Sequence, residues 1–184
     1  MIKDFFNHYR DGFIKVLVEI DPGQVEKLFD ALKETYDANG KVIIFGNGGS
    51  AANASHLAND LNKTPLNSLG VRALSLTDNV PWITAIGNDF GYEFIFVNQL
   101  ERLLEINDLV IAISSSGNSE NVIKAVEYAN SKGNKTIGIL GFGGGKLKDK
   151  VNLPVLIPTL KGEYGFMEDG TTFISHAIAS YLNR

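Results

Sequence analysis

The segment Lys41-Val-Ile-Ile-Phe-Gly-Asn-Gly-Gly-Ser50 decides the fold of this chain. Its residues 42–45 form a short apolar run that predicts a buried strand, and the glycine-rich turn after it opens directly into a helical pattern over 50–61. A second segment, Leu109-Val-Ile-Ala-Ile-Ser-Ser-Ser-Gly-Asn-Ser119, repeats the layout, with a strand over 109–113 and a helix from 119 to about 131. Turns of this kind place unpaired backbone N–H groups and the positive end of a helix dipole where an anion can bind.

Both turns are rich in groups that bind phosphate. Glycines allow the backbone to approach a ligand closely, and each serine hydroxyl can donate a hydrogen bond to a phosphate oxygen. The hydroxyls are those of Ser114, Ser115, Ser116 and Ser119. Two such turns in one small chain predict a site for a phosphorylated small molecule. The structural alternative is that Gly46 and Gly117 are turn residues and Ser119 a helix cap.

The rest of the pattern alternates between strands and helices. Strands are predicted over 42–45, 71–76, 109–113, 135–140 and 155–157, and helices over 50–61, 81–86, 94–104, 119–131 and 169–182. Continuously apolar strands separated by helices indicate a parallel sheet covered on both faces. We therefore expect an α/β fold: a doubly wound, three-layer αβα sandwich with a five-stranded parallel sheet. Ligands of such sheets bind outside the carboxyl ends of the strands, where both turns fall.

Two further helices are predicted before the first strand. An apolar stripe at helical spacing marks the first one, and Asp21-Pro22 is typical of the start of the second, which should end at Asn39-Gly40. The stripe consists of Phe5, Phe6, Tyr9, Phe13, Val16 and Leu17. We interpret residues 1–38 as a helical extension of a single domain over 1–184. Its aromatic face packs on another subunit or on its own domain, and the sequence leaves both open.

Composition excludes several classes of protein. With 184 residues and 44% hydrophobic residues the chain suits one soluble domain. It has no cysteine, which excludes disulfides, thiolate metal sites and a cysteine nucleophile. A net charge of −4 with scattered lysines disfavours nucleic-acid binding. No signal-peptide pattern or membrane-length apolar run is present, so we expect cytoplasmic residence and no membrane partner.

The two turns do not fit the common nucleotide motifs. The P-loop needs Gly-Lys-Ser/Thr, which the chain lacks. The turn Gly46-Asn-Gly-Gly-Ser50 has no third glycine at the dinucleotide-binding offset, and no clear ribose-binding acid follows the next strand. What remains is a phosphate held by hydroxyls and backbone amides.

Three segments carry a family resemblance. Gly46-Asn-Gly-Gly-Ser-Ala-Ala-Asn-Ala-Ser-His56, Gly87-Asn-Asp-Phe-Gly91 and Ile113-Ser-Ser-Ser-Gly-Asn-Ser-Glu-Asn-Val122 resemble the sugar isomerase (SIS) domain. The first two narrow the likeness to the phosphoheptose isomerase branch, and it covers nearly the whole chain. That branch implies isomerisation between sedoheptulose 7-phosphate and D-glycero-D-manno-heptose 7-phosphate through an enediol, in heptose biosynthesis for lipopolysaccharide or capsule. It also implies a homotetramer with its sites between subunits.

The resemblance assigns substrate contacts residue by residue. It implies that the four serines hold the sugar phosphate and that Asn47, Gly48 and Ser50 line the sugar. Asn88 and Asp89 lie in a loop after the second strand and its helix, and we expect them to contact the sugar as well. Asn-Asp in a loop is also common turn chemistry. Two other functions stay open: a non-catalytic SIS protein that binds a sugar phosphate or a protein, and an isomerase of a different phosphosugar.

Candidate chemistry lies on two helices. His56 and Asp60 are four residues apart and share a helix face, while Glu168 and His176 are eight apart and roughly aligned. Two imidazoles and two carboxylates make a plausible four-ligand zinc set. At the matching positions the family pattern is His, Glu, Gln and His, and these carry the catalytic and metal-binding groups. We thus expect His56, Asp60, Glu168 and His176 as zinc ligands, and Asp60, Glu168 and His176 as catalytic residues.

This chain departs from the family pattern at both acids. Asp60 is shorter than Glu, and Glu168 adds a charge where the family has Gln, so the two changes are interpreted as compensatory. The residues leave open whether the group binds zinc or acts as metal-free acid and base. The structural alternatives are a surface hydrogen bond between His56 and Asp60, and an interior role for His176.

Overall fold

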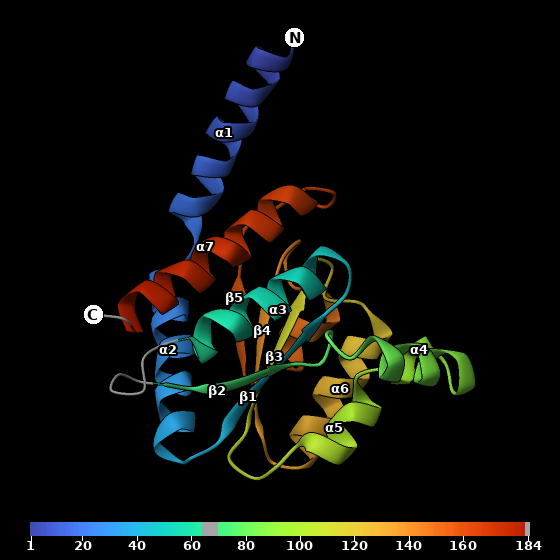
Figure 1. The fold of residues 1–184 in the computed structure, drawn as a ribbon. Coiled ribbons are helices and arrows are strands. Elements are labelled where there is room, and N and C mark those ends of the chain that lie inside the picture. Colours follow the sequence, from blue (N-terminus) through green and yellow to red (C-terminus); the bar gives the residue numbers. More distant parts are fainter. Residues whose placement is uncertain (64–69, 183–184) are drawn as a thin grey trace.

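The computed structural model describes residues 1–63 and 70–182. Figure 1 shows a central sheet with helices on both faces. The helices are α1 (Ile2–Glu19), α2 (Pro22–Asp37), α3 (Gly49–Asn62), α4 (Val80–Asp89), α5 (Val97–Leu103), α6 (Glu120–Ser131) and α7 (Tyr164–Leu182), with 3₁₀ turns η1 (Tyr92–Phe94) and η2 (Gly145–Asp149). The strands are β1 (Lys41–Gly46), β2 (Arg72–Ser75), β3 (Leu109–Ser114), β4 (Lys135–Leu140) and β5 (Leu153–Leu156).

The five strands form one parallel sheet in the order β2-β1-β3-β4-β5. This is the doubly wound order expected from the sequence, and it confirms the fold class. The strand order reverses between the neighbouring strands β1 and β3. The carboxyl ends of these two strands therefore form the topological switch point, where ligands of such sheets bind. Gly46 pairs with Ile113 at the carboxyl ends of these strands. The two glycine- and serine-containing turns therefore leave the sheet side by side.

Strand alternation divides the core into two layers. Val42 and Ile44 of β1 join the cluster formed with α1, α2, α3 and α7, while Ile43 and Phe45 join the cluster formed with α4, α5 and α6. Phe45 stacks on Phe96, with ring centroids 4.9 Å apart. Because both faces are covered, nearly all side chains of β1 and β3 are buried, which explains their uninterrupted apolar runs.

Helix α1 projects from the body of the domain (Figure 1). The middle of α1 packs on α7, where the ring centroids of Tyr9 and Phe13 lie 4.6 and 6.0 Å from that of Phe166. Its N-terminal part leaves Phe5 and Phe6 more than 60% exposed. The aromatic stripe is thus partly used within the chain and partly unpartnered. No helix in residues 1–63 and 70–182 is long and apolar enough to cross a membrane.

Side-chain amides occupy both outer edges of the sheet. On β2, the Asn62 side chain accepts from Ala73 N at 2.9 Å and donates to Ala73 O at 2.8 Å, as a neighbouring strand would. On β5, Gln24 Oε1 accepts from Leu156 N at 2.8 Å. Part of the hydrogen-bonding capacity of each edge strand is therefore filled within the chain.

The structure corrects several boundaries. Helix α7 begins at Tyr164 and not at Asp169, because packing of α1 against its first turns and complete burial of Met167 stabilise a glycine-containing segment that has weak intrinsic helix propensity. The last strand spans Leu153–Leu156 in place of 155–157. The segment predicted as a helix over 94–104 divides between η1 and α5, and η2 had no sequence signal.

Candidate active site

A cavity of about 340 Å³ lies at the switch point, outside the carboxyl ends of β1 and β3. We call it the switch-point pocket. It is lined by Asn47, Gly48, Gly49, Ser50, Ile113, Ser114, Ser115, Ser116, Ser119, Tyr164 and Glu168. The structure thus brings together the four serines with the three residues expected to line the sugar. It adds Tyr164, which the sequence analysis missed because the start of α7 was assigned to a loop.

The turn over Ser114–Ser119, which we call the serine turn, keeps its hydroxyl hydrogens available to a ligand. Ser114 Oγ accepts from Gly117 N at 3.1 Å, and Ser116 Oγ accepts from Asn118 N at 3.2 Å. A hydroxyl that accepts within the turn still has its own hydrogen to donate. Gly117 has φ +62° and a Cβ there would overlap the backbone of Gly144, so glycine is required for this turn.

Ser119 is the N-cap of α6, but its side chain makes no capping hydrogen bond. That role falls to Asn121, whose Oδ1 accepts from Val122 N at 3.0 Å. The Ser119 hydroxyl, which lines the switch-point pocket, is therefore available to a ligand. The capping alternative for Ser119 is therefore not realised in the structure, and its binding role stays a prediction.

Helix α3 also begins at the pocket, at Gly49. First-turn N–H groups lack partners within their own helix, so the starts of α3 and α6 both direct donors and positive dipole ends at this region. Glu168 lies on the α3 side, where its carboxyl group packs so closely on Gly49 that any side chain at position 49 would overlap it. The pocket thus has a serine-rich side at the turn before α6 and a carboxylate on the α3 side.

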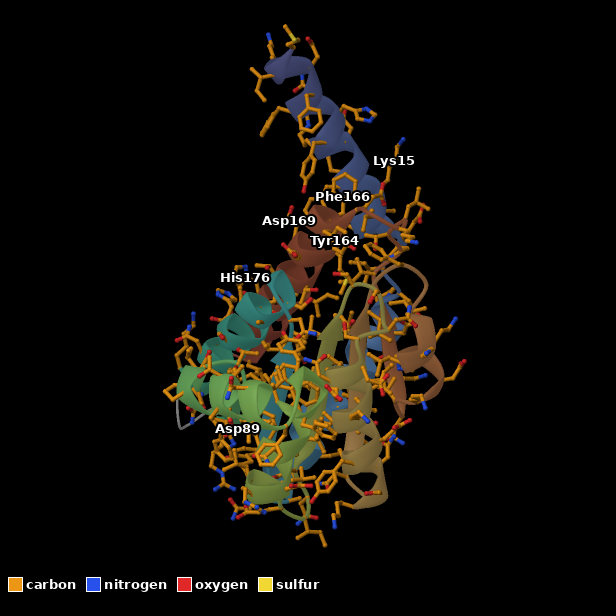
Figure 2. The ribbon with its side chains drawn as sticks, turned by 90° about the vertical axis from the view of Figure 1, so that its right-hand side faces the viewer. Lys15, Asp89, Tyr164, Phe166, Asp169 and His176 are labelled. Atoms are coloured by element: carbon orange, nitrogen blue, oxygen red, sulfur yellow. The ribbon has the colours of Figure 1, made fainter. Side chains whose placement is uncertain are left out.

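A second polar group lies further along α3, where that helix packs on α7. His56 Nε2 is 2.8 Å from His176 Nε2 and 3.2 Å from Asp60 Oδ2, and His176 Nε2 is 3.9 Å from the same oxygen. We call these three residues the His–Asp–His group. Asp60 is only 1% exposed, while both imidazoles are accessible. Figure 2 shows His176 on α7, further along the helix than Tyr164, Phe166 and Asp169.

The buried Asp60 carboxylate is held in its charged form. Burial favours the protonated acid, but the hydrogen bond from Lys63 Nζ, 2.6 Å from Asp60 Oδ1, and the nearby imidazoles outweigh it and set the pKa of Asp60 below its ordinary value. The carboxylate therefore has one oxygen against Lys63 and the other toward the histidines. Lys63 had no signal in the sequence analysis.

The His–Asp–His group has the donor types of a zinc site. The candidate ligand atoms all lie within 4.8 Å of one another. Two imidazole nitrogens on a tetrahedral zinc are about 3.3 Å apart, so a small rotation of the rings away from their 2.8 Å contact would admit the ion. Glu168, the fourth predicted ligand, is outside this group and lines the switch-point pocket instead. One chain therefore assembles three of the four.

Asn88 and Asp89 lie outside the switch-point pocket of their own chain. They end α4, both are exposed, and Asn88 Nδ2 donates to Asp89 Oδ1 at 2.7 Å. Figure 2 shows Asp89 well separated from His176 and from the start of α7. The residue of this region that reaches the pocket wall is Tyr92, whose hydroxyl donates to Asn47 Oδ1 at 3.0 Å.

Known proteins resemble this chain in sequence and in fold. The family model described as the SIS domain matches residues 5–141. The chain belongs to the SIS domain family. It is 45% identical over 161 residues to a phosphoheptose isomerase of Trichlorobacter lovleyi, covering 87% of this chain and 81% of that protein. A phosphoheptose isomerase of Geobacter sulfurreducens is 34% identical over 100% of this chain and 98% of its own.

Solved structures extend the likeness to the arrangement of the whole chain. The structure of phosphoheptose isomerase from Neisseria gonorrhoeae superposes with a TM-score of 0.91 at 25% identity, covering 100% of this chain and 99% of that one. This SIS protein therefore falls in the phosphoheptose isomerase branch, as its motifs indicated. The likeness includes the N-terminal helices, since it leaves no part of the chain unmatched.

Proposed function

We propose that the protein is a phosphoheptose isomerase that interconverts sedoheptulose 7-phosphate and D-glycero-D-manno-heptose 7-phosphate. One observation carries the proposal: α3 begins at the switch-point pocket and also carries His56 and Asp60 of the His–Asp–His group. Ser50 and His56 are separated by about 9 Å along the helix axis. A sugar held by its phosphate at the serine turn therefore has acid–base groups within reach of its far end.

Moving a proton between neighbouring carbons needs a base, and moving one between their oxygens needs a second group that exchanges protons near neutral pH. Asp60 is already engaged by Lys63 and by His56. Glu168 lines the pocket itself, so we assign it the transfer between C1 and C2. His176 lies about 12 Å from Glu168 along α7 of the same chain, so the His176 that moves the proton between the two oxygens comes from a neighbouring copy. This role belongs to the mode without bound zinc.

Zinc is part of the proposal as the ion that His56, Asp60 and His176 would hold. When bound, it would polarise the sugar carbonyl and stabilise the developing enediolate. Without zinc, the two imidazoles and the Asp60 carboxylate would carry out acid–base work alone. Removal of metal with a chelator, followed by readdition of zinc, distinguishes these two modes by the loss and return of turnover.

The proposal includes a cytoplasmic homotetramer with sites between subunits. The exposed Phe5 and Phe6 on the projecting part of α1 support a contact between copies. Asn88 and Asp89, which do not reach their own chain's pocket, are then candidates to reach a neighbour's.

The test is incubation with ketose phosphates of five to seven carbons in deuterated water. Sedoheptulose 7-phosphate should yield the aldose with solvent deuterium at C2, because the enediol exchanges its proton with the base. Deuterium entering only a shorter sugar would identify a different phosphosugar isomerase. No exchange with any sugar, while inorganic phosphate still binds, would identify a non-catalytic SIS protein.

A further inference from the structure

Asn47, at the wall of the switch-point pocket, is fixed by two residues from other elements. Its amide exchanges two hydrogen bonds with Asn121 of α6: Asn47 Nδ2 donates to Asn121 Oδ1 at 3.0 Å, and Asn121 Nδ2 donates to Asn47 Oδ1 at 2.9 Å. Tyr92 OH donates to Asn47 Oδ1 at 3.0 Å. A reciprocal amide pair closed by a third hydrogen bond leaves Asn47 little rotational freedom.

A backbone group sets the direction of this network. The oxygen and nitrogen of a side-chain amide can exchange places unless a neighbour distinguishes them. Val122 N can only donate, and it donates to Asn121 Oδ1 at 3.0 Å. The Asn121 oxygen is therefore the atom that also faces Asn47 Nδ2, and its nitrogen faces Asn47 Oδ1. Asn121 is 2% exposed, so water does not compete for these bonds.

The oxygen and the nitrogen of the Asn47 side chain differ in how fully their hydrogen bonds are used. Asn47 Oδ1 has two acceptor positions, and Asn121 and Tyr92 fill both. Asn47 Nδ2 has two hydrogens, and one is donated to Asn121; the other has no acceptor in the described part of the chain. The Asn47 side chain thus offers the pocket a donor and no acceptor.

We propose that Asn121 and Tyr92 are positioning residues that make Asn47 a hydrogen-bond donor to an oxygen of the sugar. The pocket then favours a sugar phosphate that has a lone-pair oxygen at this point over bare phosphate, which the serine turn holds without Asn47. The inference rests on the proposed function for the identity of the ligand. Tyr92, which follows α4, contacts the pocket wall of the same chain, whereas Asn88 and Asp89 at the end of α4 do not line the pocket.

The test compares two ligands, sedoheptulose 7-phosphate and inorganic phosphate, by calorimetry on the full chain. Asn121→Asp keeps an oxygen for Val122 N but removes the donor to Asn47, and Tyr92→Phe removes the other donor. The selectivity, meaning the affinity for the sugar phosphate divided by that for inorganic phosphate, should fall about tenfold in Asn121→Asp and about fivefold in Tyr92→Phe. Taking this ratio cancels the general repulsion of anions by the new carboxylate. Tyr128→Phe, the same substitution at a tyrosine of α6 that does not contact Asn47, should leave the ratio unchanged.

The two ligands distinguish a positioning role of Asn121 and Tyr92 from a purely structural one. Unchanged selectivity in both variants, or equal weakening of the two ligands, would show that Asn121 and Tyr92 only support the fold. If the wild type turns over sedoheptulose 7-phosphate, the loss in Tyr92→Phe should appear mainly in KM. A wild type without deuterium exchange would contradict the proposed function, yet a fall in selectivity would still support the donor role of Asn47. A wild type that binds the sugar phosphate no better than inorganic phosphate would overturn it.

Discussion

Replacing Lys63 tests how the Asp60 carboxylate is held in the His–Asp–His group. Lys63→Met keeps most of the side-chain stem and removes the ammonium that lies 2.6 Å from Asp60 Oδ1. A hydrogen bond to a charged group contributes roughly 1.5–3 kcal/mol, and the 59% exposure of the Lys63 side chain reduces this toward about 1 kcal/mol. For a domain of this size that loss lowers Tm by roughly 2–4 °C at pH 7.

The stability lost in Lys63→Met should depend on pH. The pKa of Asp60 lies below its ordinary value, so its contribution to stability is complete above the ordinary carboxyl pKa and is lost as the pH falls through the lowered one. The Tm difference between wild type and Lys63→Met, measured by differential scanning calorimetry, should therefore shrink below about pH 4. Zinc affinity should fall about 10- to 100-fold, because Lys63 orients a proposed metal ligand.

Two matched variants complete this experiment. Lys63→Arg retains a cation and should retain most of both effects. Lys124→Met removes a partly exposed pair with Glu120 and a contact of the ammonium with the Phe94 ring, and should change Tm less than Lys63→Met. A Lys63→Met protein indistinguishable from Lys124→Met at pH 7 would refute the reasoning. So would a Tm difference that persists unchanged in acid, because it would come from packing of the stem.

Three further predictions concern binding, catalysis and assembly. Ser116→Ala should weaken binding of sedoheptulose 7-phosphate about 10- to 100-fold by calorimetry with an unchanged circular dichroism spectrum; unaltered affinity would exclude a major phosphate contact. His176→Ala should reduce isomerisation at least about 100-fold while inorganic phosphate still binds, and full turnover would remove this residue from the mechanism. Combined Phe5→Ser and Phe6→Ser should convert a tetramer to smaller species by light scattering, whereas a wild type that is already monomeric at micromolar concentration would contradict the proposed assembly.

The fold could be predicted because the local and global signals agree. Runs such as 42–45 and 109–113 are continuously apolar, and each ends in a turn whose glycine and serine residues suit no regular element. The turns themselves then identified seven of the eight predicted residues that line the pocket, since the carboxyl ends of adjacent parallel strands meet at one edge. The start of helix α7 could not be predicted, because its first turn is stabilised by contacts with α1, and the local sequence does not show such contacts.

The division of the predicted metal set has a geometric cause. His56 and Asp60 are four residues apart and do share a face of α3. Glu168 and His176 are eight apart, which separates them by about 12 Å along the helix axis and by about 80° around it. One therefore faces the start of α3 and the other its middle. Tyr92 and Asn121 could not be identified because their role is to hold Asn47, and only the packing of η1, β1 and α6 brings the three together.

The amides on β2 and β5 bear on how copies of this chain can meet. Asn62 and Gln24 act as internal blockers on the two outermost strands, so a sixth strand from another molecule would first have to displace them. Edge-to-edge pairing of strands from different molecules, which leads to β-aggregation, is therefore disfavoured at both edges of the sheet. If copies of this chain associate as proposed, helical surfaces such as the projecting part of α1 are therefore favoured over the sheet edges.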